Sequence, residues 1–182
     1  MDLESDMRSL VAEYEDTFRT KLGGDSAADV PPMKIILKQD AVPIRVRVRK
    51  YSPPQAVFLR SKVDELLQLG LVKRNATSRW ACAPLIVPKP GPEAFRFTVD
   101  LRPVNAQTEP QAWPMPNMEA AMSELTGDTC FATMGLCHGY WQMPLDTDSQ
   151  ECQSFITPDG VFTPTRVLHG QTNATAHFQA AI

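Results

Sequence analysis

The sequence of 182 residues lacks the short patterns that usually mark metal sites. Its four cysteines form no C-x-x-C pair, and its three histidines do not have the H-E-x-x-H spacing that places two ligands on one helix face. These absences argue against a structural zinc site. Because nothing in the sequence indicates secretion, the cysteines are expected to be reduced thiols.

Long apolar runs are also missing. The longest contain only a few residues, such as "PLIVP" at residues 84–88, and the N-terminal "MDLESDMRSL" is acidic rather than basic and then apolar. The sequence therefore predicts no membrane span, no signal peptide and no membrane partner. We expect an intracellular protein, in the cytoplasm or the nucleus, and 43% hydrophobic residues suffice for the core of one ordinary domain.

Basic residues are scarce outside the middle of the chain, although the overall net charge is only −3. Residues 103–182 contain one Lys or Arg against eight Asp and Glu, and residues 1–40 contain five against nine. Residues 41–102 contain 12 against four, a net charge of +8. Such a segment could neutralise nucleic-acid phosphates and gain affinity by counterion release, although a solvated face is the commoner explanation of charge alone.

The most basic stretch is "IRVRVRK", residues 44–50. Arg45, Arg47 and Arg49 alternate with apolar residues, and Lys50 follows. A period of two predicts an extended strand or arm with the three arginines on one face. That face could contact nucleic acid, or it could be the charged outer side of an edge strand.

The remaining patterns predict short helices and hairpins. Helices are expected at residues 5–22, at 53–69 after the capping-box sequence Ser52-Pro53-Pro54-Gln55, and at 117–125. A strand is expected at residues 33–39, and antiparallel hairpins are expected to turn at residues 89–94 and 158–160. This mixture of elements predicts an α+β fold.

Four segments carry a resemblance to a known family. They are "YSPPQAVFLRSKVDELLQLGLVKRNATSRWACAPLIVPKPG", "FRFTVDLRPVN", "FATMGLCHGYWQMPL" and "TPTRVLHGQTNATAHFQ", in that order. Together they resemble the fingers, the first palm motif and the start of the long palm helix in the reverse transcriptase of gypsy-type long-terminal-repeat retrotransposons. The resemblance covers nearly the whole chain and implies right-hand polymerase-like fingers with an incomplete palm.

The resemblance also implies a division of the chain and a set of partners. The implied parts are an N-terminal connector or linker (1–40), the first part of the fingers (41–110), the first part of the palm (111–142), a fingers hairpin (143–172) and the start of the palm helix (173–182). The implied partners are an RNA/DNA primer–template and the remainder of a retroelement polyprotein. Active members of the family use Mg²⁺ held by one aspartate of a palm strand and two of a later Tyr-x-Asp-Asp hairpin.

Individual residues acquire implied roles in the same way. Lys89 and Arg96 resemble the cations that clamp the incoming triphosphate, and Lys89 is the looser match because that loop varies in length. Tyr140 resembles the aromatic residue that packs under the sugar of the nucleotide. His169 and Gly170 resemble the residues beside the nucleotide, where the family usually has Phe-Gly. Without the ordered motifs, Tyr140 would be a core aromatic and Arg96 a solvated charge.

Gly135 stands where the family has its first metal-binding aspartate. In the pattern F-x-x-x-D-L-x-x-G-Y, Phe131 is the first residue and Tyr140 the last, which leaves Gly135 at the aspartate position. Glycine has no side-chain oxygen, and the sequence contains no Tyr-x-Asp-Asp. We therefore predict that the chain alone binds no metal cofactor and has no polymerase activity.

Three interpretations stay open. The chain is a decayed or truncated retroelement product without catalysis, or the same fragment retained as a nucleic-acid-binding or protein-binding module, or a piece of a longer active polyprotein. In the third case Gly135 would be a single-base change from aspartate. Because the palm strands of the family pair with the missing hairpin, we also expect uncovered apolar surface, with self-association or disorder near residues 173–182.

Overall fold

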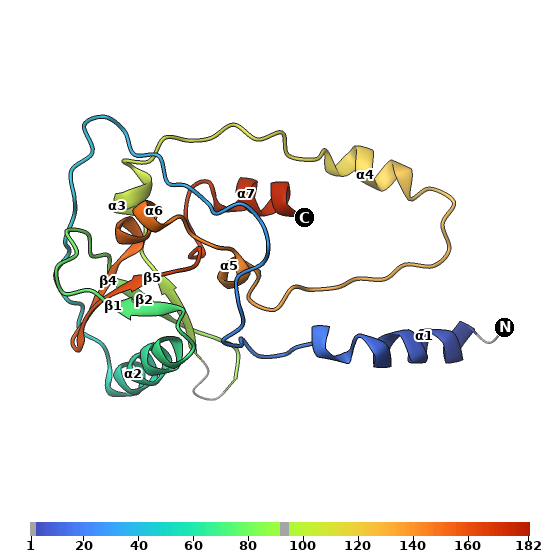
Figure 1. The fold of residues 1–182 in the computed structure, drawn as a ribbon, viewed down its shortest axis with the longest axis horizontal. Helices are drawn as coiled ribbons and strands as arrows, with labels where there is room; N and C mark the ends of the chain where they lie inside the picture. Colours follow the sequence, from blue (N-terminus) through green and yellow to red (C-terminus); the bar gives the residue numbers. More distant parts are fainter. Residues whose placement is uncertain (1–2, 92–94) are drawn as a thin grey trace.

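One long helix and two small antiparallel sheets form the packed part of the molecule, which we call the body. The computed structural model describes residues 3–91 and 95–182 (Figure 1). Helix α2 (Pro53–Gln68) lies against a sheet of β2 (Pro84–Pro88) and β3 (Phe95–Val99) and against a second sheet. The second sheet has the order β1-β5-β4, from Val72–Arg74, Gly160–Pro164 and Phe155–Thr157. The predicted α+β fold is confirmed.

Helix α2 begins and ends close to where the sequence predicts. The Ser52 N–H donates to Oε1 of Gln55 (3.1 Å), and prolines occupy the first two helical positions, where their missing N–H groups are not needed. One face of the helix packs into the core through Leu59, Val63 and Leu66. Gly70 follows the helix with a φ of 68°, a conformation that suits glycine at a helix end.

Both predicted hairpins are confirmed. Strands β2 and β3 pair with Ile86 opposite Phe97, and residues 92–94 of their predicted turn lie outside the described residues. Strands β4 and β5 pair with Thr157 opposite Gly160. Gly160 has a φ of 135°, which a residue with a side chain adopts only with strain.

Aromatic side chains join the two sheets in the core. Phe155 is fully buried, and its ring centroid lies 5.7 Å from that of Phe162 and 5.4 Å from that of Phe97. Burial raises the pKa of the Cys82 thiol to about 12 and that of Cys152 to about 11. Both thiols are free and stay protonated at neutral pH.

Short helices complete the body. They are α3 (Arg102–Asn105), α5 (Gly139–Gln142), α6 (Thr147–Gln150), the 3-10 turn η2 (Glu151–Gln153) and α7 (Ala174–Ala181). The disorder expected near residues 173–182 is not what the structure shows, because helix α7 forms there and packs Ala174 into the core. Within the described residues, no helix has the length and apolar character that a membrane crossing requires.

Two stretches with a strand-like pattern are not strands. Residues 33–39 form only isolated bridges, from Met33 to Leu145 and from Leu37 to Thr108. The arginine-rich stretch has one bridge, from Arg45 to Ala81. The first stretch meets a different part of the body at each bridge, and the second pairs only with Ala81, so neither has a continuous neighbouring strand among the described residues.

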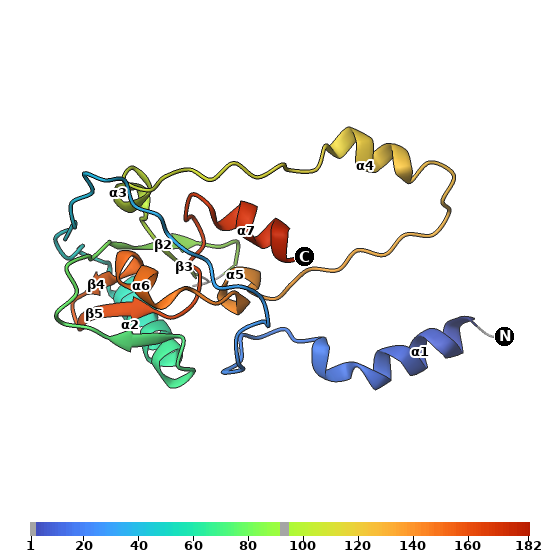
Figure 2. The same ribbon diagram turned by 45° about the horizontal axis from the view of Figure 1, so that its top comes forward.

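The N-terminal helix is shorter than predicted. Helix α1 (Leu3–Glu13) is followed by the 3-10 turn η1 (Glu15–Thr17), whereas the pattern predicted a helix to residue 22. In both views α1 points away from the body (Figures 1 and 2). The side chains of Met7, Leu10 and Val11 are exposed, and a short helix without packing is only marginally stable in water.

Residues 112–136 form an excursion that leaves the body and returns to it (Figures 1 and 2). It contains the predicted helix, α4 (Met118–Glu124), whose N-cap Asn117 accepts from the Glu119 N–H (2.9 Å). Every residue of the excursion is exposed. Its large exposed apolar side chains are Trp113, Met115, Met118, Met122, Leu125, Phe131, Met134 and Leu136. The predicted uncovered apolar surface is therefore confirmed.

Candidate nucleotide and nucleic-acid site

An aromatic cluster brings two of the predicted nucleotide-site residues together. The ring centroid of Tyr140, in α5, lies 5.3 Å from that of His169 and 5.4 Å from that of Phe178, in α7. The Tyr140 hydroxyl lies 3.2 Å from Oγ1 of Thr175. Tyr140 is half-buried, so it packs from α5 against α7 and is still partly open to solvent.

Two asparagines fix the loop that carries His169 and Gly170. Gly170 has a φ of 96°, and its carbonyl accepts from Nδ2 of Asn105 (2.8 Å). The same Asn105 accepts from the Thr172 N–H through Oδ1 (3.1 Å). Buried Asn173 donates to the Glu109 carbonyl (2.9 Å). These bonds tie the loop to α3 and to the segment that leads into the excursion.

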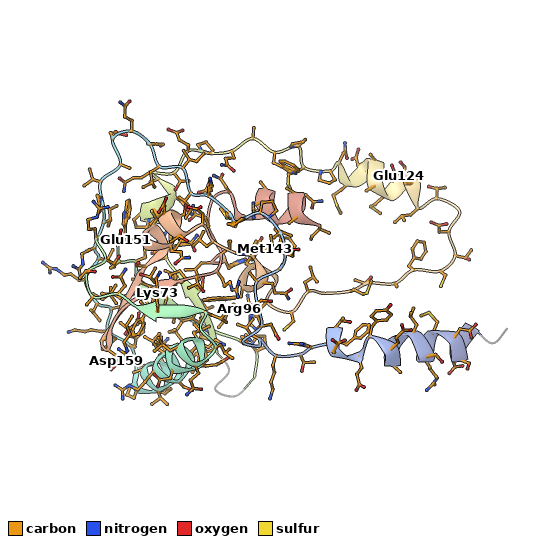
Figure 3. The ribbon with its side chains drawn as sticks, viewed as in Figure 1. Lys73, Arg96, Glu124, Met143, Glu151 and Asp159 are labelled. Carbon is orange, nitrogen blue, oxygen red and sulfur yellow. The ribbon has the colours of Figure 1, made fainter. Side chains whose placement is uncertain are left out.

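The predicted triphosphate clamp lies on the β2–β3 hairpin. Lys89 follows β2, Arg96 lies in β3 (Figure 3), and both side chains are exposed. Burial lowers the pKa of His138, at the start of α5, and the positive charge of Lys62 lowers it further. Glu65 opposes this shift, and Lys89 adds the smallest effect, which also lowers the pKa. Lys89 is therefore close enough to α5 for its charge to be felt there.

The clamp and the aromatic cluster are nevertheless two separate groups. Among the described residues, no hydrogen bond, ion pair or ring contact joins Lys89 or Arg96 to Tyr140 or His169. The structure brings Tyr140 and His169 together and leaves the two cations on exposed parts of the hairpin.

The basic stretch offers three unpaired charges. Its four cations, Arg45, Arg47, Arg49 and Lys50, are all exposed. Nη2 of Arg49 lies 3.5 Å from Oδ2 of Asp100, so this arginine already has a partner. The other three form no ion pair with any residue that the structure describes. They are the cations that remain available to a polyanion.

Asp100 also holds the start of α3. Nε and Nη2 of Arg102 donate to the two carboxylate oxygens (2.7 and 2.6 Å). These hydrogen bonds lower the pKa of Asp100, against an opposing effect of its burial. The carboxylate is therefore a structural partner of two arginines and not a free ligand.

Comparison with known proteins decides the family. No protein-family model matches the chain. It is 29% identical over 181 residues to the retrovirus-related Pol polyprotein from transposon opus of Drosophila melanogaster, which covers 97% of this chain and 18% of that protein. It is also 31% identical over 130 residues to the retrovirus-related Pol polyprotein from transposon gypsy of the same organism. That match covers 69% of this chain and 12% of that protein. The chain is a reverse-transcriptase-like region related to retrotransposon Pol polyproteins.

Solved structures share the fold of this reverse-transcriptase-like region. A crystal structure of prototype foamy virus protease-reverse transcriptase matches 98% of this chain and 24% of its own, with a TM-score of 0.83 and 20% identity. Foamy viral protease-reverse transcriptase structures in complex with double-stranded DNA and with an RNA/DNA hybrid match with TM-scores of 0.80 and 0.77, at 22% and 20% identity. Each match covers 99% of this chain. It covers 32% of the protein chain in the double-stranded DNA complex and 24% of the protein chain in the RNA/DNA hybrid complex.

Gly135 of the reverse-transcriptase-like region lies in the exposed returning arm of the excursion. Residues 131–136 form no strand, because no other described strand lies beside them. Nothing lies within 4 Å of the position that a Cβ would take at Gly135. The backbone there does not require glycine.

The residues that are present do not fit the magnesium site that the family implies. Gly135 offers no oxygen, and Oδ2 of Asp146 already accepts from the Asp148 N–H (3.2 Å) at the start of α6. Asp128 lies exposed in the excursion. The described part of the chain contains no group of three or more His, Cys, Asp or Glu side chains placed to hold a metal ion.

Several residues of the site were not foreseen from the sequence. Thr175 and Phe178 contact Tyr140, and their spacing of three places them on one face of α7, which was a usable signal. Asn105 had no such signal, because its role depends on a loop 65 residues further along the chain. His138 was missed as well, although it is the only described residue other than glycine with a positive φ (50°).

Proposed function

We propose that this reverse-transcriptase-like chain binds an RNA/DNA primer–template without catalysing polymerisation. The observation that carries the proposal is the set of three exposed cations, Arg45, Arg47 and Lys50, which have no ion-pair partner among the described residues and lie within a segment of net charge +8. Cations in this arrangement bind nucleic-acid phosphates regardless of base sequence. The nucleic-acid complexes of the foamy viral proteins, which share the fold, support it.

The absence of catalysis in this proposal follows from the chemistry at one position. Nucleotidyl transfer by the two-metal route needs carboxylate oxygens to hold the cations that stabilise the attacking and leaving oxygens. Gly135 supplies none. Phosphate binding by arginine and lysine needs no metal, so binding can persist where catalysis does not.

A second partner, the remainder of a retroelement polyprotein, is favoured by the excursion. The chain spans less than a fifth of the curated relatives named above, and the excursion exposes eight large apolar side chains. Monomeric soluble proteins seldom leave so much apolar surface bare. In this proposal, further chain of the polyprotein covers the excursion.

Fluorescence anisotropy of a labelled RNA/DNA primer–template tests the binding. We expect affinity to fall linearly on logarithmic axes as salt rises. Arg45→Ala, Arg47→Ala and Lys50→Ala together should reduce the slope of that line by about three, because each phosphate contact contributes about 0.9. The control carries Arg19→Ala, Lys21→Ala and Lys34→Ala, which remove the same charge outside residues 41–102.

Two results would contradict the binding proposal. One is a folded wild-type sample that leaves the anisotropy unchanged at low salt, and the other is an equal loss in the two triple variants. The catalytic part is tested by primer extension with Mg²⁺ or Mn²⁺. We expect no product, and extension by the purified chain would overturn that part alone.

A further inference from the structure

Helix α1 presents an apolar stripe to solvent. Its members recur at i, i+3, i+4 and i+7 and are Met7, Leu10, Val11 and Tyr14, each 47–54% exposed. The Tyr14 N–H donates to the Leu10 carbonyl (3.2 Å), so the helical turn continues as far as Tyr14. A shallow hollow runs along this helix and includes Met7, Val11 and Glu15. The stripe is a complete helical face without a partner in the body.

A helix as short as α1 is stabilised when a partner buries its apolar face. Helix α1 has 11 residues, and isolated helices shorter than about 12–15 residues are marginal in water. Amphipathic helices gain most of their stability by burying the apolar face. In both views, α1 extends away from the body (Figures 1 and 2), so the body does not cover its stripe.

The charge beside the stripe defines the partner. Residues 3–18 contain five Asp and Glu and one Arg, and that Arg8 is paired with Glu4 (2.7 Å). The excursion extends from the same end of the molecule (Figure 1) and is acidic too, with three Asp and Glu and no Lys or Arg. Like charges therefore disfavour contacts between two α1 helices or between α1 and the excursion. A basic surface with some apolar character fits α1 better.

The chain carries such a surface at its opposite end. Residues 41–52 contain four Arg and Lys and no Asp or Glu, and they run along the side of the body away from α1 in both views (Figures 1 and 2). Val42 and Val48 of this segment are exposed. Because α1 and this segment lie at opposite ends, α1 does not meet the segment of its own chain.

We propose that the acidic, apolar face of α1 binds residues 41–52 of a second copy of the chain, so that copies associate head to tail. Two different surfaces meet, so each pair retains one free surface of each kind and can add further copies. The contact involves one short helix and one short segment, so it is weak and sensitive to salt. The contact uses Arg45, Arg47 and Lys50, the cations also proposed to bind nucleic acid, so the two interactions compete for the same segment.

Sedimentation velocity of the full chain, over a range of protein and NaCl concentrations, tests this association. The first variant carries Asp6→Asn, Glu13→Gln and Glu15→Gln, and the second carries Arg45→Gln, Arg47→Gln and Lys50→Gln. Arg49 is left unchanged because it pairs with Asp100. We expect each variant alone to self-associate about tenfold more weakly or worse than the wild type, with an unchanged circular dichroism spectrum.

The mixture of the two variants is the decisive sample. The second variant keeps its acidic α1 and the first keeps its basic segment, so an equimolar mixture should form one-to-one dimers and nothing larger. Monomeric wild type at low salt would overturn the proposal. So would variants that associate as strongly as the wild type, since the contact would then lie elsewhere, with the apolar excursion the first place to look.

Discussion

The body and the excursion are both rich in apolar side chains, but only the body buries them. Phe155 and Phe162 are fully buried between paired strands, whereas Phe131 is 63% and Met134 82% exposed. The difference lies in pairing, because β4 and β5 hydrogen-bond to each other, whereas no strand in residues 3–91 or 95–182 pairs with residues 131–136. Apolar content therefore does not bury a segment unless a partner for its backbone is within reach.

The largest expected contrast is between two phenylalanines. Phe155→Ala should lower the free energy of unfolding by about 3–5 kcal/mol, because it leaves a cavity beside Phe97 and Phe162. Phe131→Ala, in the excursion, should change it by less than about 0.5 kcal/mol. Urea denaturation followed by circular dichroism measures both. Similar losses would mean that the excursion is packed in solution.

A smaller contrast separates two glycines at the point where the excursion rejoins the body. A Cβ at Gly139 would lie 2.9 Å from Cε2 of Phe178, whereas nothing lies within 4 Å of one at Gly135. Gly139→Ala should therefore reduce stability by about 1–3 kcal/mol through overpacking. Gly135→Ala is the matched control and should leave stability unchanged. Equal thermal midpoints in the two variants would show that α5 and α7 do not pack as described.

The smallest effect concerns the charges that hold α3. The pKa of Asp100 is lowered from its ordinary 3.8 by hydrogen bonds from Arg102, so its stabilising contribution is present above that value and is lost as the pH falls through the folded-state pKa. Asp100→Asn should reduce stability at neutral pH by about 0.5–1 kcal/mol, a figure discounted because the side chain of its partner Arg102 is 83% exposed to solvent.

The pH dependence distinguishes this contribution from a general loss of packing. The difference between wild type and Asp100→Asn in urea denaturation should shrink as the pH falls below 3.8. Asp128→Asn, in the excursion, is the control and should not alter the free energy of unfolding. A difference for Asp100→Asn that is the same at pH 7 and at pH 3 would refute the assignment.

Sequence patterns predicted the elements whose partners are local. Helix α2, the helix capped by Asn117 and the two hairpins are each specified within about 20 residues by caps, turns and periodicity. The strand predicted at 33–39 failed, and residues 44–50 form an arm instead of a strand, because their backbone partners, such as Leu145 and Ala81, lie far away in the sequence. Alternation shows that a segment can be extended, but it does not supply the neighbouring strand.

The candidate site also contains residues that the sequence predicted and residues that it did not. The order of the motifs predicted Tyr140 and His169 as parts of one site, and the structure brings their rings to 5.3 Å. The roles of Asn105 and Asn173 depend on contacts across more than 60 residues and had no local signal. The pairing of Arg49 with Asp100 could not be predicted for the same reason. The alternating pattern does not show which of Arg45, Arg47 and Arg49 has an acidic partner.

The empty space around Gly135 bears on how this position changes over generations. No neighbouring atom would meet a Cβ there, so folding imposes no penalty on glycine, alanine or aspartate. In this chain by itself, selection for a stable fold therefore does not distinguish among these three residues. Only selection for metal-dependent chemistry could hold an aspartate in place, and once that pressure is relaxed the position is free to drift by single-base changes in either direction.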